Sequence, residues 1–267
     1  MSKVEEKKQD MIIQIYEIQT PSEAEMLILL GVDHIGSVIL SEDYWKVSSV
    51  KETVKLVSET DCRSSLIPLF SKPDAVFRML DYYEPDILHC CEALADTNGI
   101  FESCKSLIHL QEGVKKRFPE VSIMRSVPIA QPGMGDMIPS LELARMFEPV
   151  SDYFLTDTLL VKSDSQPVAG FVGITGQICD WEVGAKLLEV SGIPVILAGG
   201  LSPDNVADAI GQTRPAGVDS CTGTNALNSK GQAARFKKNP EKVRRFVEIV
   251  RSWDVEKWKL ETGKGGI

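Results

Sequence analysis

The sequence is poor in the residues that build metal centres, disulfide frameworks and membrane spans. It has six cysteines and three histidines in 267 residues, and no Cys-x-x-Cys pair, which argues against a zinc site or a disulfide scaffold. No apolar run reaches the roughly 18 residues of a membrane span. The first ten residues are largely charged and no apolar h-region of a signal peptide follows them, so a secretory signal is not expected. We therefore expect a cytoplasmic protein without metal, cofactor or membrane partner.

Basic residues are also fewer than acidic ones. Lysine and arginine total 29 against 38 aspartates and glutamates, for a net charge of -9, which argues against a nucleic-acid surface. A hydrophobic content of 43% and a charged content of 25% are those of an ordinary globular protein. The length suits one α/β barrel, which needs about 250 residues. We expect one domain over 1–267, with a charged extension at 1–10 and a tail at 254–267.

Short apolar runs alternate with helical patterns about eight times along the chain. Runs that are apolar on both faces are typical of strands in a parallel sheet covered by helices. Strands are predicted at 11–18, 34–40, 64–70, 86–90, 121–127, 152–157, 193–200 and 216–221. Helices are predicted at 20–31, 48–58, 72–82, 102–118, 140–147, 181–190, from Ser202 onward, and at 240–253. Eight such units favour a closed (β/α)8 TIM barrel over an open sheet.

Three connections are longer than a minimal barrel needs, and each leaves the carboxyl end of a predicted strand. They are 90–100, 130–139 and 162–175. Barrels place their active sites at this end. These segments are therefore candidate lids, with plain surface insertions as the alternative.

The strongest chemical signal lies near the C-terminus. The seventh predicted strand runs into Gly199 and Gly200, and the eighth into Cys221-Thr222-Gly223-Thr224. Glycines at a strand end let backbone N–H groups approach an anion, and loops after strands seven and eight hold phosphate in this fold. We predict that both loops meet at one phosphate-sized pocket.

These segments resemble a known family. ILAGGLSPDNVADAI and RPAGVDSCTG are similar to the closing strands of phosphoribosylanthranilate isomerase, the barrel enzyme of tryptophan biosynthesis. GITGQ followed by Asp180-Trp181, LTDT at 155–158 and ILH at 87–89 extend the resemblance. It covers about residues 12–250 and is specific from residue 152 onward. It implies a small phosphorylated sugar as ligand, contacts from Gly176 and Asp219, and a homodimer as one possible assembly.

The chemistry that this resemblance implies is an Amadori rearrangement. A general acid opens the sugar ring and a general base removes the C2 proton. The family's acid corresponds to Asp157, whose carboxyl at a buried strand end can have a raised pKa. The alternative is that Asp157 only caps a loop.

The base is where the sequence departs from the family. The family's first strand ends in Lys-Ile-Cys-Gly with the cysteine as base, whereas this chain has Gln14-Ile15-Tyr16-Glu17. A phenol is a poor base at neutral pH, so Tyr16 predicts little or no ordinary isomerase activity. Glu17, His89 or Cys90 is the candidate replacement; His89 satisfied by its neighbours is the structural alternative.

The family's basic residue after strand two, which holds the anthranilate carboxylate, also has no clear counterpart here. Lys46 lies close in the sequence, and Arg125 could offer a bidentate fork to a carboxylate or phosphate. A structural arginine is the alternative. Three hypotheses follow: an isomerase with a replaced base, a paralogue acting on another phosphosugar, or a non-catalytic phospholigand-binding barrel.

Overall fold

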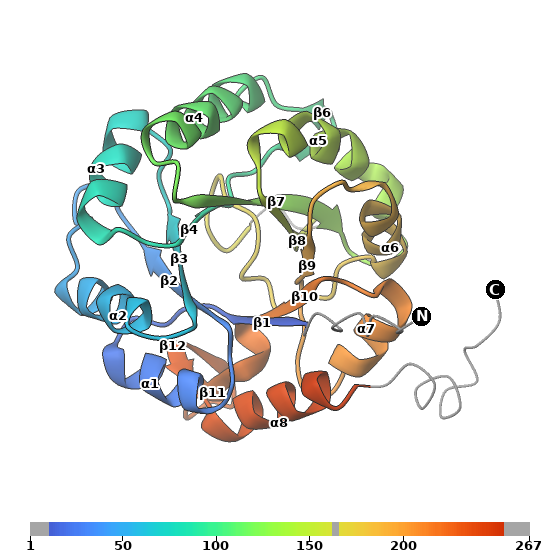
Figure 1. The fold of residues 1–267 in the computed structure, drawn as a ribbon. Helices are drawn as coiled ribbons and strands as arrows, with labels where there is room; N and C mark the ends of the chain where they lie inside the picture. Colours follow the sequence, from blue (N-terminus) through green and yellow to red (C-terminus); the bar gives the residue numbers. More distant parts are fainter. Residues whose placement is uncertain (1–10, 162–165, 254–267) are drawn as a thin grey trace, which may run out of the picture.

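Eight parallel strands close into a barrel in the computed structural model, which describes residues 11–161 and 166–253 (Figure 1). The predicted extension at 1–10 and tail at 254–267 lie outside the described residues. The strand order around the barrel is β1-β10-β9-β8-β7-β4-β3-β2. These strands are β1 (Ile12–Ile15), β2 (His34–Ile39), β3 (Arg63–Pro68), β4 (Ile87–Cys90), β7 (Ser122–Ala130), β8 (Tyr153–Leu159), β9 (Val195–Leu197) and β10 (Gly217–Ser220). The predicted (β/α)8 TIM barrel is confirmed.

Helices surround the strands and bury their apolar stripes against the outside of the barrel (Figure 1). They are α1 (Pro21–Leu29), α2 (Ser48–Ser58), α3 (Pro73–Tyr83), α4 (Cys104–Arg117), α5 (Ser140–Phe147), α6 (Trp181–Val190), α7 (Val206–Thr213) and α8 (Pro240–Arg251). Capping explains several of the starts. The Asp180 carboxylate accepts from the second and third residues of α6, and the Asn239 amide oxygen does the same for α8.

One predicted helix start was wrong. The Ser202-Pro203 pair reads as a first helical turn, but α7 begins at Val206. The backbone N–H of Ser202 donates to the side chain of Asn205 over 2.8 Å. This side-chain bond closes a turn in place of the first helical hydrogen bonds, which delays the helix by one turn.

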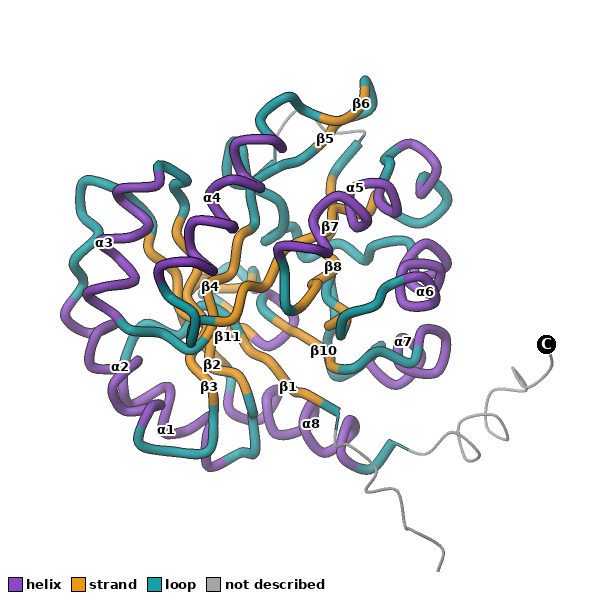
Figure 2. Tube along the Cα trace, turned by 45° about the horizontal axis from the view of Figure 1, so that its top comes forward, coloured by secondary structure: helices purple, strands orange, loops and turns teal. Residues whose placement is uncertain are grey.

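Two antiparallel hairpins that the sequence reading missed are inserted at the carboxyl ends of barrel strands. The first consists of β5 (Ala95–Asp96) and β6 (Gly99–Ile100), and it lies beside α4 and α5 in Figure 2. The second consists of β11 (Asn225–Leu227) and β12 (Ala233–Lys238), next to α1 and α8 in Figure 1. Three short 3-10 helices complete the described elements, Gly135–Met137, Glu148–Val150 and Thr222–Thr224.

Two long connections join over the mouth of the barrel. The backbone N–H of Ala93 donates to Gly170, and that of Val172 donates to Cys91, over 2.8 and 2.9 Å. The connections after β4 and after β8 therefore form one backbone-bonded roof.

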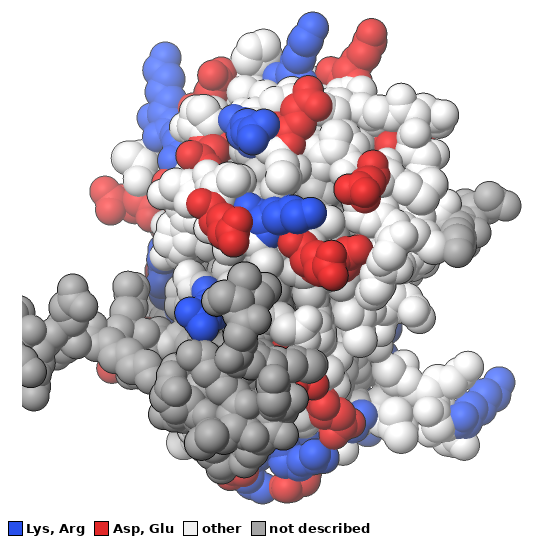
Figure 3. Space-filling view, turned by 90° about the vertical axis from the view of Figure 1, so that its right-hand side faces the viewer, with Lys and Arg blue, Asp and Glu red and all other residues white. Residues whose placement is uncertain are grey.

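The surface carries mixed charges. On the face drawn in Figure 3, acidic and basic side chains are interspersed rather than gathered by sign. No helix in the described part of the chain is long and apolar enough to cross a bilayer.

Candidate active site

The loops after β9 and β10 line one pocket, as the sequence predicts. Its wall combines both loops with the connection before α6, and its lining residues are Asp157, Ile174, Thr175, Gly176, Gly199, Gly200, Leu201, Asp219, Cys221, Thr222 and Gly223. Gly223 shows how closely the loops approach, because a Cβ added there would lie 2.1 Å from the carbonyl oxygen of Leu201. Glycine-rich backbone at adjacent strand ends is the setting in which proteins hold phosphate. We call this pocket the anion pocket.

Thr224 does not belong to this lining, which corrects its assignment as a phosphate contact. Its side chain is fully buried, and both its N–H and its hydroxyl donate to the carbonyl of Cys221. Those bonds close the 3-10 turn at 222–224. Thr224 therefore shapes the pocket without facing it.

A second pocket adjoins the first and is largely apolar. It lies between the barrel interior and the roof formed by the two long connections. Its lining residues are Tyr16, Glu17, Val38, Ile67, Leu69, His89, Cys91, Leu155, Asp157, Phe171, Val172, Ile174, Asp219 and Cys221. Asp157, Ile174, Asp219 and Cys221 line both pockets. We call this second space the apolar chamber.

Asp157 and Asp219 are the two carboxyls in that shared wall. Burial raises the pKa of Asp157 from 3.8 to about 7, although the Thr158 N–H that donates to it over 2.8 Å works in the opposite direction. Burial, together with the nearby charge of Asp157, raises the pKa of Asp219 to about 8. The Gln14 amide donates to Asp219 over 3.2 Å and orients it. Both carboxyls therefore titrate near neutral pH, and the charge of Asp157 couples the two titrations.

Tyr16 points into the barrel and is fully engaged there. Its hydroxyl contacts Ser65 Oγ, and it lies 2.7 Å from Nδ1 of His89, whose Nε2 lies 2.8 Å from Ser126 Oγ. Burial raises the pKa of the Tyr16 phenol and lowers that of His89 to about 3. Both groups stay neutral over the physiological range. They form a polar chain across the barrel interior, which favours the structural alternative for His89.

Glu17 lies at the end of β1 in a left-handed conformation, with φ of 67°. Its carboxylate is 1% exposed and forms a 2.6 Å ion pair with Nε of Arg235 on β12. Asn225 and the backbone of Phe236 donate to the same carboxylate. The hairpin β11–β12 therefore holds Glu17 in place, and the Glu17 carboxylate has a structural role.

Cys90 is unsuited as a base for another reason, because burial raises its pKa to about 12.

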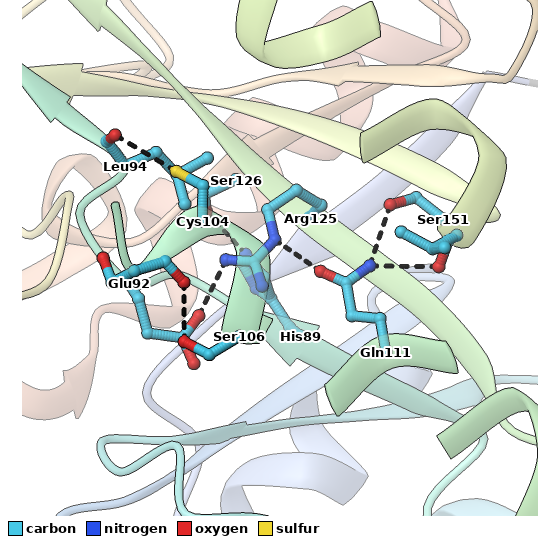
Figure 4. A network of polar contacts seen from close by, with 11 residues as sticks. His89, Glu92, Leu94, Cys104, Ser106, Gln111, Arg125, Ser126 and Ser151 are labelled. Atoms are coloured by element: carbon cyan, nitrogen blue, oxygen red, sulfur yellow. Dashed lines mark hydrogen bonds and ion pairs between the residues drawn. The ribbon is translucent and has the colours of Figure 1, made fainter. Parts of the chain in front are cut away.

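Arg125 was expected to contact the ligand, and its position does not fit that role. Its side chain has no exposed surface, and it pairs with Glu92 over 2.7 Å and donates to Gln111 over 2.8 Å (Figure 4). It also lies 4.8 Å over the ring of Phe147. Arg125 lines neither the anion pocket nor the apolar chamber. It attaches the connection after β4 to β7, which is the structural alternative.

Lys46 is also directed elsewhere. Its ammonium lies 5.1 Å from the ring of Trp45 and 5.3 Å from that of Tyr82. Both distances are in the range of cation–π contacts. Among the described residues, no group of three or more histidine, cysteine or acidic side chains could hold a metal ion.

Several lining residues escaped the sequence reading. Phe171 comes from the connection after β8, and Leu69 follows β3. Their only signal was position after a strand end, which they share with many loop residues. Gln14 had a stronger signal, because alternation along β1 places it on the same side as Tyr16.

Comparison with known proteins agrees with this architecture. The family model for N-(5'-phosphoribosyl)anthranilate (PRA) isomerase matches residues 128–249, from β7 to α8. An N-(5'-phosphoribosyl)anthranilate isomerase of Methanosarcina mazei is 29% identical over 82% of this chain and 87% of its own length. The chain is therefore similar to phosphoribosylanthranilate isomerases along most of its length, and the family model itself matches the part from β7 to α8.

Further phosphoribosylanthranilate isomerases show how the likeness is distributed along the chain. The enzyme of Methanocella arvoryzae is 36% identical over 138 residues. That match covers 52% of this chain and 54% of the relative, so it spans about half the length of each protein. The phosphoribosyl anthranilate isomerase structure of Thermus thermophilus has a TM-score of 0.63 at 18% identity, over 91% of this chain and all of that one. Another phosphoribosyl anthranilate isomerase structure is a complex with reduced 1-(o-carboxyphenylamino)-1-deoxyribulose 5-phosphate. Its TM-score is 0.60 at 18% identity, over 89% of this chain and 97% of that one.

Proposed function

We propose that the chain isomerises an N-glycosidic phosphoribosyl amine to the corresponding amino-deoxyribulose phosphate, as a phosphoribosylanthranilate isomerase-like enzyme. The phosphate occupies the anion pocket, with Gly176 among its walls, and the sugar lies between Asp157 and Asp219. The observation that carries this proposal is the shared wall, since both carboxyls line the anion pocket and the apolar chamber.

The two carboxyls divide the proton transfers between them. Asp157, in its acid form, protonates the ring oxygen; the C1–O bond breaks and the nitrogen lone pair forms a protonated Schiff base. The carboxylate of Asp219 then removes the C2 proton, and the electrons of that C–H bond give the enolamine. The enolamine becomes the ketone when the proton of its C2 hydroxyl leaves and C1 gains one. The pair starts and ends with one proton, which moves from Asp157 to Asp219.

Asp219 takes the role of base because each of the other candidates is either uncharged or already held in an ion pair. Tyr16 and His89 stay neutral in their hydrogen-bonded chain, and Glu17 is paired with Arg235. Because the two pKa values, about 7 and about 8, lie close together, the form with Asp157 protonated and Asp219 ionised is a minor but populated state near neutral pH, and it is the form that reacts. Asp219 therefore replaces the cysteine that the family uses at the position of Tyr16.

The proposal is tested by turnover of freshly prepared N-(5'-phosphoribosyl)anthranilate and N-(5'-phosphoribosyl)aniline. Asp157→Asn and Asp219→Asn should each lower turnover by roughly 10²–10⁴-fold, the usual contribution of positioned proton transfer. Asp61→Asn is the matched control, because Asp61 is exposed before β3 at the opposite end of the barrel. Undiminished turnover in Asp157→Asn would remove that residue from the mechanism. Binding of phosphorylated sugar without turnover of either substrate would favour the non-catalytic alternative.

The proposal also includes a cellular location and an assembly for the protein. Six free cysteines support a location in the reducing cytoplasm. The isomerase of Thermotoga maritima is described as dimeric, which supports a homodimer as the assembly of this chain.

A further inference from the structure

We infer that the amine part of the substrate is an apolar group without a carboxylate. This inference rests on the proposed function, because it concerns the group that the apolar chamber receives while the phosphate occupies the anion pocket. The relatives are named for a substrate whose amine is anthranilate, which is a carboxylated aromatic amine. The chamber of this chain is built for an aromatic or aliphatic amine without that charge.

The composition of the wall is the first argument. Seven of the fourteen lining residues have pure hydrocarbon side chains, contributed by β2, β3 and β8, by the residue after β3 and by the roof: Val38, Ile67, Leu69, Leu155, Phe171, Val172 and Ile174. Apolar groups enter such a space favourably, since contact with water is lost on both surfaces. Phe171 adds a ring that can pack against an aromatic amine.

The charges of the wall are the second argument. Its carboxyl side chains are Glu17, Asp157 and Asp219, which are either neutral or of the same sign as a substrate carboxylate. A carboxylate brought into the chamber would lose its hydration and meet like charges, and both effects oppose binding. The wall residues that the structure describes include no lysine or arginine.

The cations near the chamber are the third argument, because each already has a partner within the protein. Arg235 is paired with Glu17, and the ammonium of Lys238 donates to the Cys221 carbonyl and the Asn225 side chain. The two residues expected from the sequence to hold a carboxylate point elsewhere, Lys46 to aromatic rings and Arg125 to Glu92. A substrate carboxylate would have to compete with these partners for the positive charge.

The test uses two reduced product analogues that differ only in the carboxylate. One is reduced 1-(o-carboxyphenylamino)-1-deoxyribulose 5-phosphate, the compound bound in a related structure. The other is its counterpart made from aniline. Calorimetry on the wild-type chain should give a dissociation constant at least tenfold lower for the aniline analogue. Equal or tighter binding of the carboxylated analogue would overturn the inference and leave the proposed function intact.

A charge variant sharpens the test. Leu69→Arg places a cation in the chamber and should shift the preference toward the carboxylated analogue by about tenfold or more. Leu29→Arg is the matched control, because Leu29 is 86% exposed on α1, and it should leave the preference unchanged. If wild type binds neither analogue, the inference and the proposed function fail together. If it binds the aniline analogue tightly and turns over neither substrate, the inference holds and the proposed activity fails.

Discussion

Replacing Asp157 by asparagine should make the protein more stable, and by a larger margin as the pH rises. Burial raises the pKa of Asp157 from 3.8 to about 7, so the folded chain holds this proton more tightly than the unfolded chain does. The stability due to the bound proton is fully present below pH 3.8 and is lost as the pH rises through 7. A difference of that size corresponds to about 4 kcal/mol. Asparagine avoids the loss because it never ionises, and its oxygen can still accept from Thr158.

Urea unfolding at two pH values measures this effect. The gain in unfolding free energy of Asp157→Asn over wild type should be about 2 kcal/mol at pH 5 and about 4 kcal/mol at pH 8.5. With a urea slope of about 3 kcal/mol per molar, the second value shifts the midpoint by about 1 M. Asp61→Asn, at an exposed position, is the control and should shift little at either pH. A gain that is the same at both pH values, or a less stable variant at pH 8.5, would refute the reasoning.

Three further predictions follow. A Cβ on Gly36 would lie 2.2 Å from the Tyr16 ring, so Gly36→Ala should lower the free energy of unfolding in urea by about 1–3 kcal/mol. Adding Tyr16→Cys should recover most of that loss. If the double variant recovers nothing, the ring is not the obstacle. Arg125→Met should destabilise by about 3–5 kcal/mol because it leaves Glu92 buried without its partner, and the double variant with Glu92→Leu should lose less in the same assay. The pH profile of kcat/KM should be bell-shaped around the pKa values of Asp157 and Asp219, about 7 and about 8; an Asp219→Asn variant that retains both limbs would exclude this pair as the origin of the profile.

Much of the fold was predictable because its signals are local. Strands buried on both faces appear as continuous apolar runs, and α2, α5 and α6 have the predicted bounds. The anion pocket was predictable because topology fixes which strand ends are neighbours. Gly199 and Gly223 line it for that reason.

The remaining features depend on partners that are distant in the sequence. The Tyr16 hydroxyl meets Ser65 and His89, which are 49 and 73 positions away. Arg125 finds Glu92 33 positions earlier, and nothing near either residue indicates the pairing. The strands of the hairpin β11–β12 have only three and six residues, so they give little periodic signal. A lining residue such as Phe171 is assigned only when the two connections are seen to join.

The ion pair between Glu17 and Arg235 has a consequence for synthesis of the chain. Its two residues are 218 positions apart, and translation at about 5–20 residues per second separates their appearance by roughly 10–40 seconds. β1 also lacks its neighbour β10 during that interval, because β10 spans Gly217–Ser220. The end of β1 therefore reaches its final conformation only after the hairpin has left the ribosome. The apolar chamber, although its residues Tyr16 and Glu17 are made early, is among the last parts of the molecule to form.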